Sequence, residues 1–338
     1  MRQHFLQKLG TNWKIAAIVG LSKNAGKTTF LNWIVSKYAD RKIGIITTGR
    51  DGEEIDLVGG HYKPKVLVPA GSFFSTGEKV IKRNANSLNV ISKLPYVAGG
   101  QRLWLVQSTE KIYSEIIGPA TASDQVELAK MILSFGANYV FIDGSLDRKS
   151  IALSNKIDTI LLVAGASGGD LDYINKETSR IALLANIPKI KIPIDDYTKI
   201  SYKFNNKIFI TELNSILNQE KRILEIPNID AAEWIYFPKA FTARNFEKLH
   251  SALENVNFIF YHPLHIQLKF DQLERIIEKT CVINKIKIDA IVLNSYSVKG
   301  NHLDCEILRS EIRKGFPEIP VIDITELEIM ENYSKKGN

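Results

Sequence analysis

Gly26, Lys27 and Thr28 are the residues whose types and spacing point most directly to chemistry. They lie in IAAIVGLSKNAGKTTFLNWIV, residues 15–35, between an apolar run and a segment with helical spacing of apolar residues. A phosphate group needs converging backbone N–H groups, a cation and a metal ligand, and a loop that leads into a helix supplies the first. We therefore expect Gly26 to let the backbone approach closely, Lys27 to reach the β- and γ-phosphates, and Thr28 to bind Mg²⁺.

This loop departs by one position from the phosphate-binding pattern G-x-x-x-x-G-K-[ST]. The pattern places its first glycine at position 21, which is Leu21 here, and the glycine lies one residue earlier, at Gly20. Because a strand precedes the loop and a helix follows it, we interpret the loop as a nucleotide-binding P-loop with one extra residue at its mouth. The expected nucleotide contacts are Gly20, Lys23, Asn24, Ala25, Gly26, Lys27, Thr28 and Thr29. For Lys23, a solvated side chain is an open alternative.

Two carboxylates follow strands that would end at the same edge of the sheet. Asp51, in TTGRDGEEID, could hold a metal-bound water or orient the attacking water. Asp143 follows the apolar run YVFI, as the magnesium-polarising carboxylate of NTPases does. The alternatives are a solvated turn for Asp51 and a simple strand end for Asp143. Catalytic candidates are thus Lys27, Asp51 and Asp143, and the candidate metal ligands are Thr28 and Asp143.

The implied cofactors are ATP and Mg²⁺, because no guanine-reading NKxD pattern is visible. The loop NSYSVKG, residues 294–300, follows a strand and could read a base or bind a partner, although an ordinary loop is the simpler interpretation.

The elements around these residues alternate between strand and helix. Apolar runs predict strands at 14–20 and 42–48, and Thr28 to Tyr38 has helical spacing, so the chain opens as a β-α-β unit with parallel strands. Residues 61–118 then predict a β-rich insertion folded onto the first domain, from the β-type runs KVLVP, KVIKR, LNVISKL, RLWLVQS and EIIGP.

Alternation resumes with a helix at 122–135, capped by Ser123 or Asp124, and continues with strands at 138–144 and 158–166 and a helix at 171–186. From residue 187 a second α/β pattern begins, with a hairpin about Asn205-Asn206. The sequence thus predicts an α/β protein with two domains, a P-loop NTPase domain at 1–190 and a smaller α/β domain at 191–338.

Composition is that of a folded protein, with 45% apolar and 24% charged residues among 338. The net charge of +7 is spread along the chain, so nucleic acid is not an expected partner. Cys281 and Cys305 match neither a zinc spacing nor a disulfide framework. No apolar run is long enough to span a bilayer, so we expect a cytoplasmic protein with no membrane partner.

The combined motifs resemble a known family. GLSKNAGKTT, then ITTGRDGEEIDLVGGHYKPKVLVPAGSFFST, then IGPATASDQVELAKMILSFGANYVFIDGSLDRKSIA are similar to the non-MutS-like subunit of the lysine 5,6-aminomutase reactivase of lysine-fermenting bacteria. The similarity covers residues 14–166 and fades after residue 190. It implies nucleotide-driven release of damaged cobalamin from the adenosylcobalamin-dependent aminomutase, with that enzyme and a MutS-like ATPase subunit as partners. More distantly, the loop resembles that of dethiobiotin synthetase and its relatives.

Three functions are consistent with the sequence. The first is a Mg-ATP-binding accessory protein, a slow ATPase that assists aminomutase reactivation in amino-acid fermentation. The second is an ATP-dependent small-molecule kinase or ligase of the dethiobiotin-synthetase type. The third is a non-enzymatic interaction protein whose conformation is held by a bound nucleotide.

Overall fold

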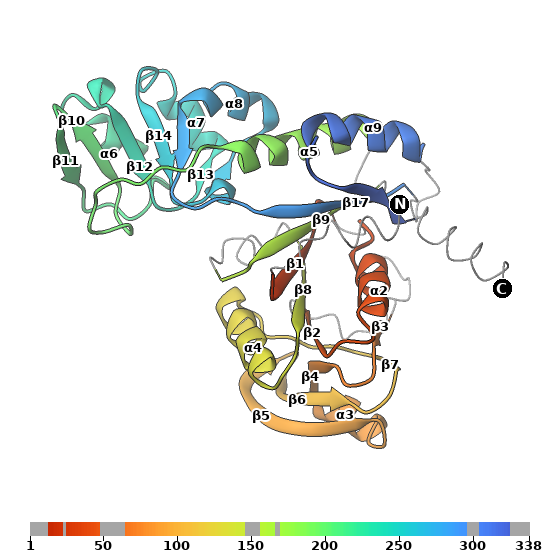
Figure 1. The fold of residues 1–338 in the computed structure, drawn as a ribbon. Coiled ribbons are helices and arrows are strands. Elements are labelled where there is room, and N and C mark those ends of the chain that lie inside the picture. Colours follow the sequence, from red (N-terminus) through yellow and green to blue (C-terminus); the bar gives the residue numbers. More distant parts are fainter. Residues whose placement is uncertain are drawn as a thin grey trace. The chain divides into compact units, whose positions relative to one another are not determined.

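The computed structural model describes residues 13–22, 25–47, 65–145, 156–165, 170–295 and 304–324. By its internal contacts the chain divides into two compact units (Figure 1). The first unit comprises residues 1–174 and 288–338, and the second comprises residues 175–287.

The first unit is built on a nine-stranded, mostly parallel sheet with the order β18-β17-β9-β1-β8-β2-β4-β6-β5. Its strands are β1 (Ile15–Gly20), β2 (Ile43–Thr47), β4 (Phe73–Gly77), β5 (Leu88–Ala98), β6 (Gln101–Ser108), β8 (Tyr139–Ser145), β9 (Thr159–Gly165), β17 (Ile288–Asn294) and β18 (Val321–Asp323). Among these strands β6 runs against the rest, because it pairs antiparallel with both β4 and β5. The predicted α/β class and parallel β-α-β start are confirmed. β1 lies between β8 and β9. Where the chain connections leave neighbouring central strands towards opposite sides, a crevice forms at the carboxyl ends of those strands, and open α/β sheets bind ligands there.

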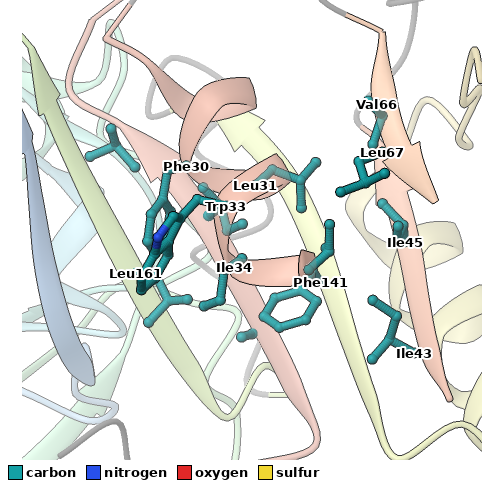
Figure 2. Packing of buried hydrophobic residues seen from close by; sticks show 14 of the residues in the cluster. Phe30, Leu31, Trp33, Ile34, Ile43, Ile45, Val66, Leu67, Phe141 and Leu161 are labelled. Atoms are coloured by element: carbon teal, nitrogen blue, oxygen red, sulfur yellow. The ribbon is translucent and has the colours of Figure 1, made fainter. Parts of the chain in front are cut away.

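Helix α2 (Lys27–Lys37) packs its apolar side onto one face of this sheet. Phe30, Leu31 and Ile34 are fully buried, and Figure 2 shows them between Leu161 and Phe141. Ile43 and Ile45 of β2 and Val66 and Leu67 of β3 (Val66–Val68) belong to the same cluster. Burial of each such side chain contributes about 1.5–3 kcal/mol, so this face fixes the start of α2 relative to β1.

Helix α4 (Ala122–Ser134) covers the other face (Figure 1). Ile43 and Ile45 of β2 face α2, so Gly44 between them faces α4. A Cβ atom on Gly44 would lie 2.5 Å from Cγ2 of Ile132 in α4. Glycine is therefore needed for α4 to approach the strand this closely. The cap of α4 is Thr121, whose side chain accepts the N–H of Asp124, rather than the predicted Ser123 or Asp124.

The β-rich insertion extends the main sheet, with two local corrections. KVIKR forms part of helix α3 (Glu78–Arg83) instead of a strand, and Lys82 pairs with Glu78 one turn earlier at 2.8 Å. EIIGP is not a strand; β7 (Ile112–Ser114) lies just before it and pairs with β3. The carbonyls of Ile116 and Ile117 instead accept the hydroxyls of Thr47 and Ser75, and the N–H of Ile117 donates to the carbonyl of Ser75.

The second unit contains a five-stranded mixed sheet with the order β11-β10-β12-β14-β16. Its strands are β10 (Ser201–Phe204), β11 (Lys207–Ile210), β12 (Trp234–Phe237), β14 (Asn257–Phe260) and β16 (Thr280–Val282), with a small β13 (Phe241–Thr242) and β15 (Ile266–Gln267) pair. Its helices are α5 (Leu171–Asn186), which begins in the first unit, α6 (Glu220–Leu224), α7 (Ala243–Leu249) and α8 (Phe270–Glu274), with 3₁₀ turns η2 (Ile229–Ala231), η3 (Pro263–His265) and η4 (Ile277–Lys279). The predicted hairpin about Asn205-Asn206 is confirmed.

This division of the chain differs from the expected boundary near residue 190. Strands β17 and β18, with helix α9 (Cys305–Gly315) between them, come from the expected second domain, but β17 pairs with β9 of the first sheet. The difference has a physical reason: β9 has a free edge after β1, and β17 continues the parallel ladder there.

Candidate functional site

The loop between β1 and α2 begins directly after Gly20, the last residue of β1. The N–H of Leu21 donates a hydrogen bond of 2.9 Å to the carbonyl of Val163 in β9. This bond belongs to the pairing of Gly20 with Val163 in the parallel ladder, so β1 ends at Gly20. The extra residue of the sequence pattern therefore lies in the loop, and Ala25 and Gly26 directly precede α2.

Gly26 forms the start of α2 in a conformation that favours glycine. Its φ of 97° and ψ of 18° are left-handed, and no side chain caps the helix. A Cβ atom on Gly26 would lie 2.5 Å from Nδ2 of Asn294. The first N–H groups of α2 therefore remain uncovered by a capping side chain, and the positive end of the helix dipole lies at the loop.

Lys27 folds back across the end of β1. A Cβ atom on Gly20 would lie 2.9 Å from Cδ and 3.0 Å from Nζ of Lys27, so only glycine leaves this path open without displacing the side chain. The ammonium group and the uncapped helix start therefore lie at the same loop. Together they make the carboxyl end of β1 an electropositive site suited to an anion.

Two neighbouring strands brace the loop from the side opposite β8. A Cβ atom on Gly165, at the end of β9, would lie 2.5 Å from the carbonyl oxygen of Ala25, which is fully buried. Asn294 is the register partner of Gly165 at the end of β17, and it contacts the space around Gly26. Sequence reasoning did not single out Gly165, and it treated Asn294 only as the start of a loop. The available signal was the position of both residues at the ends of apolar runs.

Asp143 lies on the other side of β1. It pairs in register with Ile18 of β1 and with Thr47 of β2, and it is only 5% exposed. Since side chains alternate along a strand, Asp143 faces the same side as Phe141, which packs beneath α2 (Figure 2). The carboxylate therefore lies on the α2 side of the sheet, near its carboxyl edge.

The structure brings most of the predicted site residues to one sheet edge. Gly20, Ala25, Gly26, Lys27, Thr28, Thr29 and Asp143 all occupy the ends of β1 and β8 or the start of α2. Lys23, Asn24 and Asp51 lie outside the described residues, as do residues 296–300 of the loop after Asn294.

The residues present fit a nucleotide phosphate and one magnesium ion. The hydroxyl of Ser22 is buried without a hydrogen-bond partner in the described part of the chain, and the absence of a Cβ atom on Gly20 leaves room for the Lys27 side chain beside the end of β1. Among the described residues, no group of three or more His, Cys, Asp and Glu side chains could hold a metal. Thr28 and Asp143 would hold magnesium only together with phosphate oxygens and water, as is usual for this ion.

Comparisons of the chain with protein families, with curated proteins and with solved structures gave no match. Within the described ranges, none of the helices has both the length and the apolar character that crossing a bilayer requires.

Proposed function

We propose that the first unit is a P-loop NTPase domain that binds Mg-ATP and hydrolyses it slowly. One observation carries this proposal: Lys27 lies over Gly20 beside a helix start that no side chain caps. A structural turn has no use for open N–H donors and a cation at the same point, whereas a triphosphate uses both.

Each side chain then has a distinct role in the proposed site. Gly20 and Gly26 let the phosphates approach the backbone, and Lys27 neutralises the β- and γ-phosphates. Thr28 binds the magnesium ion, and Asp143 orients a water on that ion. Ala25, Thr29, Lys23 and Asn24 complete the loop, and Asp51 is the candidate for orienting the attacking water.

The proposed cellular role is assistance to a partner enzyme. The motifs in residues 14–166 resemble the aminomutase reactivase subunit, which favours an adenosylcobalamin-dependent aminomutase and a MutS-like ATPase subunit as partners. The second unit adds a separate folded body without a cluster of metal-ligating side chains in its described residues. The surface of this unit is available to bind a partner protein. Nucleotide-dependent ordering of a loop would couple nucleotide binding to partner binding.

Calorimetry on a Lys27→Ala variant tests the nucleotide site. The charge-assisted contacts of Lys27 contribute about 1.5–3 kcal/mol, so ATP affinity should fall at least about tenfold. Lys37→Ala, in the last turn of the same helix, is the matched control and should bind as the wild type does. Equal affinity in the wild type and Lys27→Ala contradicts the site. The same titration with GTP tests the choice of ATP.

Phosphate release tests the partner role separately. Basal turnover should lie well below the enzyme median of about 10 s⁻¹. An aminomutase that carries inactivated cobalamin, added with the MutS-like subunit, should raise turnover severalfold and recover aminomutase activity. Fast turnover without partners, coupled to a phosphorylated small molecule, would favour a kinase or ligase instead.

A further inference from the structure

The side chain of Asn294 reaches the start of α2, although β9 separates β17 from β1 in the sheet. A Cβ atom on Gly26 would lie 2.5 Å from Nδ2, 3.1 Å from Cβ and 3.1 Å from Cγ of Asn294. The carboxamide of Asn294 therefore occupies the volume that a side chain of residue 26 would need.

The loop between β1 and α2 crosses the end of β9 to make this contact. A Cβ atom on Gly165 would lie 2.5 Å from the carbonyl oxygen, 2.8 Å from Cα and 2.9 Å from the carbonyl carbon of Ala25. Because Gly165 and Asn294 are register partners, Ala25 and Gly26 lie on two adjacent strand ends. Ala25 is fully buried there, whereas Gly26 is partly exposed. A ligand can therefore approach Gly26 from the side that Asn294 does not cover.

Gly26 has no preference of its own that would keep it left-handed. Glycine populates positive and negative φ about equally, so its neighbours must select the observed φ of 97°. The carbonyl of Gly26 accepts the N–H of Phe30 at 3.0 Å, which is the first hydrogen bond of the helix. The contact with Asn294 limits Gly26 on the side where other residues have a Cβ atom.

Asn294 itself lies on a strand end that is held from both sides. β17 pairs with β9 as far as Asn294, and with β18 as far as Leu293, the register partner of Asp323. The next residue, Ser295, donates its N–H to the carboxylate of Asp323 at 3.2 Å, and Asp323 is fully buried. The backbone of Asn294 therefore cannot move away from Gly26 without breaking these bonds.

Two roles for the start of loop 294–300 were consistent with the sequence, namely reading a base and an ordinary loop. The structure places Asn294 against Gly26, the residue directly before Lys27. In a nucleotide-binding loop this is the part that meets phosphate, which all nucleotides share. The position of Asn294 thus favours a role that does not depend on the base.

We propose that Asn294 is a positioning residue for phosphate binding, an inference that rests on the proposed nucleotide site. Its side chain holds Gly26 in the left-handed conformation, and this conformation sets the direction of the first N–H groups of α2. A phosphate then meets donors that are already in place, so less ordering is needed on binding. Asn294 acts through Gly26 and does not touch the ligand.

Calorimetry with ATP, GTP and inorganic tripolyphosphate, each with Mg²⁺, tests this role. Asn294→Ala should lower the affinity at least about tenfold, and by a similar factor for all three ligands, because the loop loses its preorganisation. Asn138→Ala is the matched control: the Oδ1 of Asn138 accepts the N–H of Lys42 at 3.2 Å at the amino end of β8, and this variant should bind as the wild type does.

The three ligands also separate the outcomes that overturn the proposal. A loss confined to one nucleotide would show that Asn294 contacts a base, which overturns the positioning role. Equal affinities in the wild type and Asn294→Ala overturn this role and leave the proposed nucleotide site standing. A wild type that binds none of the three ligands contradicts the proposed function, and the role of Asn294 falls with it.

A double variant tests the contact between Gly26 and Asn294. Asn294→Ala removes Nδ2 and Cγ, two of the atoms that the new Cβ atom of Gly26→Ala would meet. Gly26→Ala should therefore lower ATP affinity less in the Asn294→Ala background than in the wild type, by a factor of about three or more. Gly136→Ala, where no neighbouring atom lies within 4 Å, should show no such coupling. Independent effects of Gly26→Ala and Asn294→Ala overturn the contact.

Turnover at saturating ATP separates positioning from a purely structural role. A positioning residue affects binding, so phosphate release by Asn294→Ala should stay within about threefold of the wild-type rate once ATP saturates the site. A purely structural role would instead lower the folded fraction, so turnover would fall while the affinity of the remaining folded molecules stayed unchanged. That second pattern overturns the proposal.

Discussion

Two strand-to-helix turns, one from each unit, show opposite ways to begin a helix. Between β1 and α2, Gly26 begins the helix without a side-chain cap. Between β13 and α7, Thr242 accepts the N–H of Asn245, and Asn245 accepts the N–H of Thr242 at 2.8 Å, which is a capping box. Asn245 in turn donates to buried Glu220 at 2.8 Å. The second turn satisfies its own donors, whereas the first leaves them open.

The same contrast extends to the strand ends. In the first unit, Lys27 and Asp143 place opposite charges near the ends of β1 and β8. In the second, His262 follows β14 and accepts the N–H of Leu264 at 3.3 Å, which closes the strand end with the chain's own groups. Open donors reduce stability unless a ligand satisfies them, so of these two turns the first is the one that we propose binds a ligand.

Asp143→Asn should have the largest effect, and on turnover. The proposed carboxylate acts on magnesium and its water, so its loss should slow hydrolysis about hundredfold, or 2.7 kcal/mol, while ATP affinity changes less. Phosphate release and calorimetry measure the two quantities. Asp158 is the matched control: its carboxylate accepts the N–H groups of Lys14 and Ile15 at the opposite end of β1. Wild-type turnover in Asp143→Asn, or an equal loss in Asp158→Asn, contradicts the assignment.

Gly26→Ala tests the open helix start itself. The left-handed conformation costs a non-glycine residue about 1–2 kcal/mol, and the new Cβ atom would collide with Asn294. Thermal stability should fall, and ATP affinity should fall at least about tenfold, or 1.4 kcal/mol. Gly136 has a similar φ of 94° but open space around it, so Gly136→Ala should lower stability alone. If both variants bind ATP equally well, the loop does not need its glycine.

Lower pH should weaken the second unit at His262. Burial, and less strongly the neighbouring His265, lowers the pKa of His262 to about 4. Its ordinary pKa is about 6.5, so the unfolded state takes up the proton first as pH falls from 6.5 towards 4. Between pH 7 and pH 5 the free energy of unfolding should drop by about 2 kcal/mol through this residue.

Hydrogen exchange of the amides in residues 257–268, corrected for intrinsic rates, measures this drop. His262→Asn keeps an acceptor for Leu264 but does not titrate, so the pH dependence should shrink. His250→Asn, elsewhere in the same unit, should leave it in place. An unchanged pH dependence in His262→Asn would show that other groups cause it.

Sequence patterns were sufficient to predict elements whose structure depends on residues close together in the sequence. The GKTT segment, the helix at 171–186 and the turn at Asn205-Asn206 depend on residues close in sequence, and their elements are confirmed. Glycine before lysine at a helix start requires no distant partner to be recognised.

The secondary-structure and domain predictions were wrong where the structure depends on contacts between residues far apart in sequence, or on local contacts that outweigh intrinsic preference. KVIKR contains β-branched residues, yet the preceding Glu78 and its pair with Lys82 favour one helical turn. The pairing of β17 with β9 joins residues far apart in sequence, and apolar runs do not reveal partners. For the same reason Gly165 and Asn294 could not be placed beside the loop between β1 and α2 from sequence alone.

The smallest effect should come from the capped turn. Thr242→Ala removes an N-cap and should lower the free energy of unfolding by about 1 kcal/mol, with ATP affinity unchanged, because α7 lies outside the proposed nucleotide site. Thr28→Ala, in the first turn of α2, should do the reverse: it should weaken magnesium-dependent ATP binding and change stability by less than about 0.5 kcal/mol. Urea titrations without nucleotide and calorimetry with and without Mg²⁺ separate the two. If Thr242→Ala impairs ATP binding, or Thr28→Ala only destabilises, the two helix starts do not divide stability and binding between them. A capped helix start serves stability because its donors are already satisfied, and an open one serves binding because they are not.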